Sequence, residues 1–106
     1  MRSRIQFINE KIKEAFNKLK KEDSKMHNIL LRAFNDIENN VFCGIQIPKR
    51  LIPQEYFKKY NIKNLWKYNL PDAWRLIYSI EGKNLLVISI ILEWMDHKTY
   101  ERRFKY

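Results

Sequence analysis

At 106 residues, of which 45% are apolar, the chain is long enough for one compact domain and too short for a second core, and this composition excludes a disordered chain. One cysteine and two histidines exclude both an intrachain disulfide framework and a tetrahedral zinc site, and the longest apolar run, residues 85–92, is far shorter than the roughly 20 residues of a membrane helix. The net charge of +9 favours a polyanionic partner such as RNA, DNA or an anionic surface.

Two amphipathic helices are predicted in the first 40 residues. The first spans roughly residues 4–21, where apolar residues recur at three- and four-residue steps: Ile5, Ile8, Ile12, Phe16 and Leu19. Asp23 and Ser24 then provide a stop and a new N-cap. A second apolar stripe over residues 26–37 ends at Asn39-Asn40, so we expect an α-hairpin with a tight turn.

The segment of residues 41–80 carries most of the excess charge, with 7 basic and 2 acidic residues. Pro48 and Pro53 bracket residues 49–52, which we expect to be extended and basic because the two prolines disfavour a continuous helix. Residues 54–60 fit a short helical turn. Basic residues interleaved with aromatic ones in this segment are typical of a nucleic-acid contact.

The second half of the chain predicts strands. Residues 64–70 alternate in part, and residues 73–80 alternate clearly, with Trp74, Leu76, Tyr78 and Ile80 on one side and Arg75, Ile77 and Ser79 on the other. Residues 81–84 predict a hairpin turn, and residues 85–94 form the most apolar strand, expected at the centre of the sheet. Asp96 is placed to cap a final short helix over residues 97–104.

This order of elements predicts an α+β fold. Two N-terminal helices would pack on one face of a twisted antiparallel sheet, followed by a short C-terminal helix, and the other face would stay partly open. Arg75 would lie on that open face, framed by basic loops. Such a face is suited to a phosphate backbone.

Three segments resemble the RelE/ParE toxin superfamily: residues 47–53 (IPKRLIP), 64–80 (NLWKYNLPDAWRLIYSI) and 91–104 (ILEWMDHKTYERRF). The resemblance covers about residues 24–106 and is sharpest over residues 64–106, where an R-x-I-Y strand, a hairpin, an apolar strand and a His-plus-Tyr/Arg terminus follow in order. It implies a microbial-ribonuclease-like fold and the toxin half of a toxin–antitoxin module. RelE-type members cleave mRNA without a metal, usually at the ribosome, whereas ParE-type members share the fold and inhibit DNA gyrase.

The resemblance also implies roles for individual residues. Arg75 corresponds to a basic sheet residue that contacts the scissile phosphate, and His97 to a histidine that acts as acid or base in one subgroup. Tyr100 and Arg103 correspond to a C-terminal tyrosine or arginine that assists in others. Further contacts to the RNA backbone are expected from the remaining cations of the same regions: Lys49, Arg50, Lys67 and Arg102.

Metal-free RNA cleavage needs a base, an acid and cations on the phosphorane. Histidine is the side chain whose ordinary pKa, roughly 6.5, lies near working pH, which makes His97 the candidate for proton transfer. Arg75 presents fixed donors to the non-bridging oxygens. The general base stays open, since Glu93 is the only carboxylate candidate. Arg75 would alternatively pair with Glu93 across neighbouring strands, and Arg102 and Arg103 would alternatively complement the helix dipole or bind an antitoxin.

We therefore expect one cytoplasmic domain over residues 1–106, a metal-independent endoribonuclease that acts on mRNA and the ribosome and is neutralised by a cognate antitoxin. No membrane, metal or cofactor is expected. Two other classes remain open: a non-enzymatic ParE-type toxin that poisons DNA gyrase, and an inactive RNA-binding module.

Overall fold

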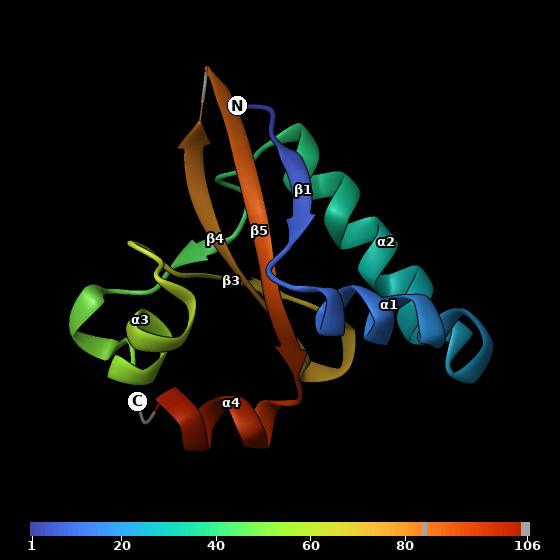
Figure 1. Ribbon diagram of the computed structural model, residues 1–106. Coiled ribbons are helices and arrows are strands. Elements are labelled where there is room, and N and C mark those ends of the chain that lie inside the picture. The colour runs from blue at the N-terminus through green and yellow to red at the C-terminus, as the bar shows by residue number, and fades with distance from the viewer. Residues whose placement is uncertain (84, 105–106) are drawn as a thin grey trace.

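Residues 1–83 and 85–104 are described by a computed structural model, in which a five-stranded mixed sheet carries helices on both faces (Figure 1). Its α+β class agrees with the sequence prediction. The elements in chain order are β1 (Arg4–Phe7), α1 (Glu10–Glu22), α2 (Ser24–Asn39), β2 (Ile45–Gln46), a 3-10 turn (Lys49–Leu51), α3 (Gln54–Tyr60), β3 (Trp66–Asn69), a second 3-10 turn (Pro71–Ala73), β4 (Arg75–Lys83), β5 (Leu86–Met95) and α4 (His97–Phe104).

The strand order in the sheet is β1-β5-β4-β3-β2. β1 runs parallel to β5, whereas the other neighbouring pairs are antiparallel, so the expectation of a purely antiparallel sheet is wrong at one edge. Most of the chain lies between β1 and β5, and no tight turn fixes their relative direction. β4 occupies the middle of the sheet, and β5 has neighbours on both sides.

Residues 4–7, expected in the first helix, form strand β1 instead. Ile5 and Phe7 pack on the first face of the sheet while Arg4 and Gln6 are exposed, which is the two-residue period of a strand. The helix begins only after Asn9, whose side-chain oxygen accepts a hydrogen bond from the backbone N–H of Ile12 at 2.9 Å. The spacing of the apolar residues around residues 4–7 therefore fits both a helix and a strand, and pairing with the edge of β5 stabilises the strand.

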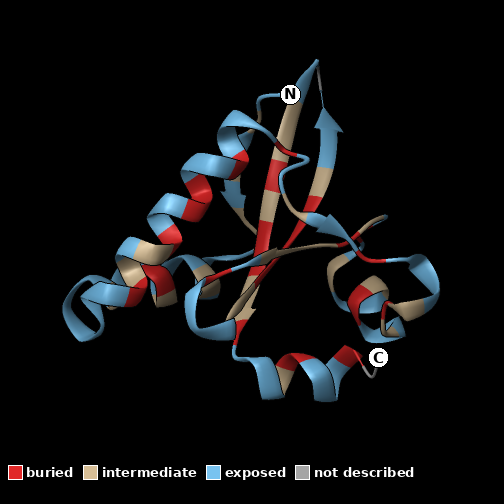
Figure 2. Cartoon of the chain, turned by 180° about the vertical axis from the view of Figure 1, so that it is seen from behind, coloured by how far each residue is buried: buried red, intermediate tan, exposed pale blue. Residues whose placement is uncertain are grey.

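The first face of the sheet is covered by α1 and α2. Asp23 caps α2 through the backbone N–H of Met26 at 3.1 Å, so the predicted helix boundary is confirmed. Buried residues recur along one side of α2 (Figure 2). They join the residues that we call the first core: Phe16, Met26, Leu30, Ala33, Phe34, Ile37, Val41, Leu70, Leu76, Tyr78 and Ile91.

The second face is covered at one end by α3 and α4. The residues buried there form the second core: Ile47, Ile52, Tyr56, Ile62, Leu65, Ile77, Leu92, Met95, Tyr100 and Phe104. The rest of this face holds a groove of about 600 Å3 lined in part by Ser79, Gly82 and Ile90, so the face is partly open, as predicted. Arg75, expected on the open part, lies at the covered end.

Two local predictions on this side are wrong. Residues 49–51 form a single 3-10 turn rather than an extended segment, because the N–H of Ile52 turns back to the Lys49 carbonyl at 3.1 Å and buries the Ile52 side chain. Residues 81–83, expected in the hairpin turn, continue β4, because residues 86–88 of β5 supply backbone partners for them. Asn84 of that predicted turn lies outside the described residues.

Candidate functional site

Helix α4 lies across the end of the sheet (Figure 1), and it carries three of the four predicted catalytic residues: His97, Tyr100 and Arg103. Asp96 starts the helix by accepting a hydrogen bond from the Thr99 backbone N–H at 2.8 Å, as predicted. Tyr100 and Phe104, one turn apart, are buried in the second core. At about 100° per residue, His97 and Arg103 lie on opposite edges of this buried stripe.

Two cations meet at the ring of Tyr100, and we call these three residues the cation–tyrosine cluster. The Lys67 Nζ lies 5.0 Å from the ring centroid and the Arg75 guanidinium carbon 5.8 Å from it. These distances suit a cation–π contact. Arg75 starts β4 opposite Met95, and Lys67 comes from the neighbouring strand β3, so the sheet itself sets their spacing.

Arg75 is incompletely satisfied. One terminal nitrogen of its guanidinium donates to the Trp74 carbonyl at 3.1 Å, whereas its Nε is buried without a hydrogen-bond partner. Within residues 1–83 and 85–104, no carboxylate forms an ion pair with Arg75. A buried donor without a partner costs free energy, and a charged one costs more, so the hydrogen bonding of Arg75 is incomplete within the described residues.

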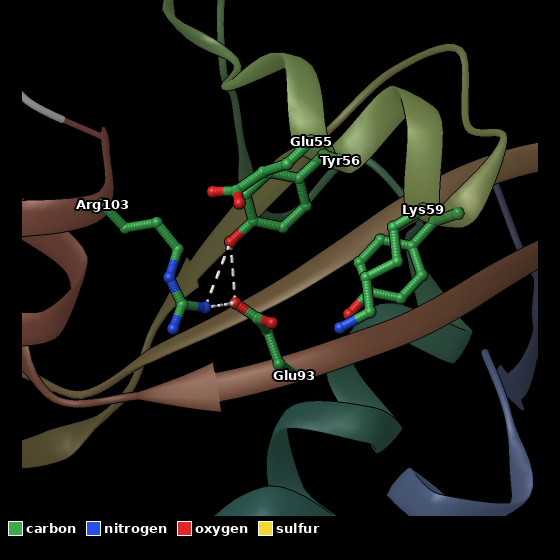
Figure 3. Close-up of a pocket in the computed structure, with 6 residues that line it drawn as sticks. Glu55, Tyr56, Lys59, Glu93 and Arg103 are labelled. Atoms are coloured by element: carbon green, nitrogen blue, oxygen red, sulfur yellow. Dashed lines mark hydrogen bonds and ion pairs between the residues drawn. The ribbon is translucent and has the colours of Figure 1, made fainter.

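A second arrangement surrounds Glu93, and we call it the carboxylate cavity (Figure 3). The Tyr56 hydroxyl donates to Glu93 Oε1 at 2.7 Å, and the Arg103 guanidinium donates to the same oxygen. Arg103 also donates to the Tyr56 hydroxyl at 3.4 Å, which closes a triangle between α3, β5 and α4. The cavity has a volume of about 230 Å3 and is lined by Glu55, Tyr56, Lys59, Tyr60, Glu93 and Arg103.

A β-bulge directs Glu93 into this cavity. Ile77 of β4 pairs with Glu93 and Tyr78 pairs with Ile91, so Leu92 is an extra residue in β5. Ile91 lies in the first core, and strict alternation would turn Glu93 toward that same face. The bulge instead places Leu92 and Glu93 in succession on the second face, a re-aiming of side chains that bulges commonly perform.

The hydrogen-bond triangle is electrostatically consistent. Burial raises the pKa of Tyr56 well above its ordinary value, so its hydroxyl stays protonated and remains a donor. The Tyr56 hydroxyl and the charge of Glu93 raise the pKa of Arg103, despite its partial burial. Glu93, with 17% of its side chain exposed, is thus held by two donors rather than solvated.

His97 lies near these groups but makes a separate contact. Its Nε2 is 2.8 Å from the Glu101 carboxylate one turn further along α4, and 48% of its side chain is exposed. Tyr100, three residues later, contacts Arg75, so His97 and Arg75 reach the same end of the sheet. In the part of the chain that the structure describes, no hydrogen bond joins His97 to Arg75.

The other predicted contact residues are exposed. Lys49 and Arg50 lie on the 3-10 turn before α3, and Arg102 lies on the outer side of α4. The predicted catalytic set is therefore divided: Tyr100 joins Arg75, Arg103 joins Glu93, and His97 joins Glu101. The ion pair that was weighed between Arg75 and Glu93 is replaced by the pair of Glu93 with Arg103.

Sequence reasoning missed Tyr56 and Lys59 as members of the cavity. Both lie on α3, which was predicted only as a short helical turn, and no spacing in the sequence relates α3 to Glu93 or Arg103. The signal that was available is the amphipathic order of α3, in which Tyr56 is buried and Lys59 exposed. It identifies a buried tyrosine but not its partner.

A scan of protein-family models, a search of curated proteins and a search of solved structures each find no match to this chain. Among the described residues, no helix has both the length and the apolar character needed to cross a membrane. The same residues contain no group of three or more His, Cys, Asp or Glu side chains placed to hold a metal ion.

Proposed function

We propose that this chain is a RelE-like, metal-independent endoribonuclease toxin that cleaves mRNA at the ribosome in the cytoplasm and is neutralised by a cognate antitoxin. The observation that carries the proposal is Arg75, a half-buried guanidinium with a partnerless Nε and no carboxylate ion pair in the described chain. The sequence resemblance assigns this same residue to the scissile phosphate.

A phosphodiester matches the cation–tyrosine cluster chemically. Guanidinium N–H groups donate to the non-bridging oxygens of a phosphate in a fixed geometry, and Arg75 keeps its charge at every working pH. Lys67, beside the same ring, adds a second positive charge. The exposed cations Lys49, Arg50 and Arg102 would follow the flanking phosphates, while Arg103 is engaged with Glu93 until a ligand competes for it.

The proton-transfer group in this proposal is His97. Cleavage removes the proton from a 2′-hydroxyl, which attacks the adjacent phosphorus; the bond to the 5′-oxygen breaks, and that oxygen takes up a proton. The products are a 2′,3′-cyclic phosphate and a 5′-hydroxyl. Histidine is the residue type suited to proton transfer near neutral pH, and His97 is half-exposed, so substrate can reach it.

The test is cleavage of mRNA on translating ribosomes in the presence of EDTA, with the 5′ ends mapped. We expect His97→Ala and Arg75→Ala each to lower the cleavage rate by roughly 10²–10⁴-fold, the usual contribution of a proton-transfer or charge-stabilising group. Arg32→Ala is the matched control, because it removes the same charge from the exposed side of α2. Full cleavage by both active-site variants would refute the proposal.

One observation favours a second candidate, a non-enzymatic ParE-type toxin that binds a protein such as DNA gyrase. His97 pairs with Glu101 of its own helix, an arrangement that needs no proton transfer. Gyrase inhibition without RNA cleavage, unchanged in His97→Ala, would select this candidate. RNA binding without either activity would indicate an inactive RNA-binding module.

A further inference from the structure

The carboxylate cavity combines three features within one small space. Glu93 supplies a fixed acceptor, Arg103 and Lys59 supply cationic donors, and the rings of Tyr56 and Tyr60 lie 6.0 Å apart at its wall. Its volume of about 230 Å3 is below the 300–1,000 Å3 of typical drug-sized sites, so it suits one small planar group.

Glu93 has an oxygen to offer to a ligand. Oε1 accepts from both Tyr56 and Arg103, whereas Oε2 accepts no hydrogen bond from any side chain or backbone group of the described residues. In the view of Figure 3, this second oxygen lies on the side of Glu93 that faces Lys59. A carboxylate held in this way by two donors has a fixed orientation.

Guanine is the nucleobase that complements this arrangement. Its Watson–Crick edge places two N–H donors, N1 and N2, next to the O6 acceptor. The donors match a carboxylate and the acceptor matches a guanidinium or an ammonium group. Adenine presents an unprotonated N1 at the corresponding position, where it would face the lone pairs of Glu93. The half-buried ring of Tyr60 offers a surface on which a splayed base can stack.

We propose that the carboxylate cavity binds a guanine base, with Glu93 accepting from N1–H and N2–H and Arg103 or Lys59 donating to O6. The inference deepens the proposed function and rests on it in one respect, namely that the guanine belongs to the RNA strand. Helix α4 links the two sites, because it supplies Arg103 to the cavity and Tyr100 to the cation–tyrosine cluster. The cavity then selects which nucleotide accompanies the phosphate at Arg75.

The first measurement is equilibrium binding of 2′-O-methyl RNA hexamers, which lack the attacking hydroxyl. We expect a hexamer with one central guanosine to bind about 5- to 150-fold more tightly than the all-adenosine hexamer, the range for one bidentate base contact. Inosine, which lacks the N2 amino group, should bind with intermediate affinity. Equal affinity of the guanosine and adenosine hexamers would overturn the proposal.

The second measurement uses Glu93→Gln, which keeps the shape of the side chain and its acceptor for Tyr56. We expect this variant to lose the guanosine preference, because a carboxamide has only one acceptor oxygen, while its affinity for the adenosine hexamer should stay the same or rise, since a Gln amide is able to pair with adenine. Glu38→Gln, on the exposed side of α2, is the charge-matched control and should keep the preference. A parallel loss of affinity for both hexamers would indicate a structural role and overturn the assignment of Glu93.

A third measurement distinguishes binding of a free nucleotide from binding of RNA. Together with the cleavage assay, it also tests the guanine site independently of the proposed nuclease activity. Binding of 5′-GMP over 5′-AMP, with the same Glu93→Gln effect, would support a guanine site whether or not the hexamers bind. Guanosine preference without any mRNA cleavage would leave the cavity assigned and the nuclease refuted. Cleavage without any guanosine preference would refute only the cavity assignment.

Discussion

The two faces of the sheet are covered by different kinds of helices and residue types. The first core is formed largely by two helices of 13 and 16 residues, and its buried members are apolar or aromatic. The second core is assembled from a 3-10 turn, a seven-residue helix and an eight-residue helix, and charged groups reach into its edge: Arg75, Glu93 and Arg103. The same sheet therefore supports a packed face and a chemical face.

The two faces therefore differ in how much their buried side chains contribute to the free energy of unfolding. Apolar burial on the first face contributes most where side chains are fully excluded from water, as at Leu30 and Ile37. On the second face, polar groups occupy positions that apolar side chains would otherwise fill. Some of these groups lack a hydrogen-bond partner, as the Arg75 Nε does. Groups of this kind cost stability, and in proteins they are found more often at functional sites than elsewhere.

The largest expected effect is on the first face. Leu30→Ala removes a side chain with no exposed area from the middle of the first core, and we expect it to lower the free energy of unfolding by about 2–5 kcal/mol. Tyr56→Phe, on the second face, removes only a hydroxyl and should cost about 1 kcal/mol. Urea unfolding followed by circular dichroism measures both. A larger loss in Tyr56→Phe than in Leu30→Ala would contradict the division between the faces.

On both faces, the elements that were predictable from sequence are those with local signals. The stripe of α2 and its Asp23 cap are local signals, and so are the alternation of β4 and the Asp96 cap of α4. Strand β1 was missed because Ile5, Ile8 and Ile12 satisfy a helical stripe, and only the free edge of β5 decides otherwise. The carboxylate cavity was missed because a bulge at Leu92 turns Glu93 to the other face, and the partners come from distant segments.

Alkaline pH should act on both faces through buried tyrosines. Burial raises the pKa of Tyr56, and it raises the pKa of Tyr68 to about 12 with help from the hydrogen bond to Asp36. Above the ordinary value of 10.0 the unfolded chain releases these protons while the folded chain keeps them. The stability that these tyrosines contribute is therefore fully present below pH 10 and is lost as the pH rises toward their raised folded pKa values.

Tyr56→Phe isolates the second-face share of this pH dependence. We expect its unfolding free energy to fall less steeply above pH 10 than that of the wild type, because one titrating group is gone. The control is Tyr60→Phe, which removes the hydroxyl of a half-buried tyrosine on the same helix. Parallel pH profiles for the wild type and Tyr56→Phe would contradict the raised pKa of Tyr56.

A smaller effect is expected when the triangle around Glu93 is opened. Arg103→Met keeps the apolar stem but leaves Glu93 with Tyr56 as its remaining partner, and we expect a loss of about 1 kcal/mol, because water partly screens the pair. Arg102→Met removes the same charge from the exposed side of α4 and should change stability by less than about 0.5 kcal/mol. Equal effects of the two variants in urea unfolding would show that the ion pair contributes nothing.

The smallest effect distinguishes the caps of two helices. Asn9 caps α1 with an amide, whereas Asp96 caps α4 with an exposed carboxylate, and the hydrogen bonds from Thr99 lower the pKa of Asp96 below 3.8. The cap on α4 is therefore intact above pH 3.8 and is lost as pH falls through the lowered folded value.

In amide-resolved NMR, the Thr99 signal should titrate in acid while Ile12 does not. Asp96→Asn keeps an acceptor without the charge, so its α4 should respond less to acid. Because α4 carries Tyr100 and Arg103, loss of this cap in acid would loosen α4 on the second face, and a wild-type Thr99 signal that does not move would contradict the lowered pKa of Asp96.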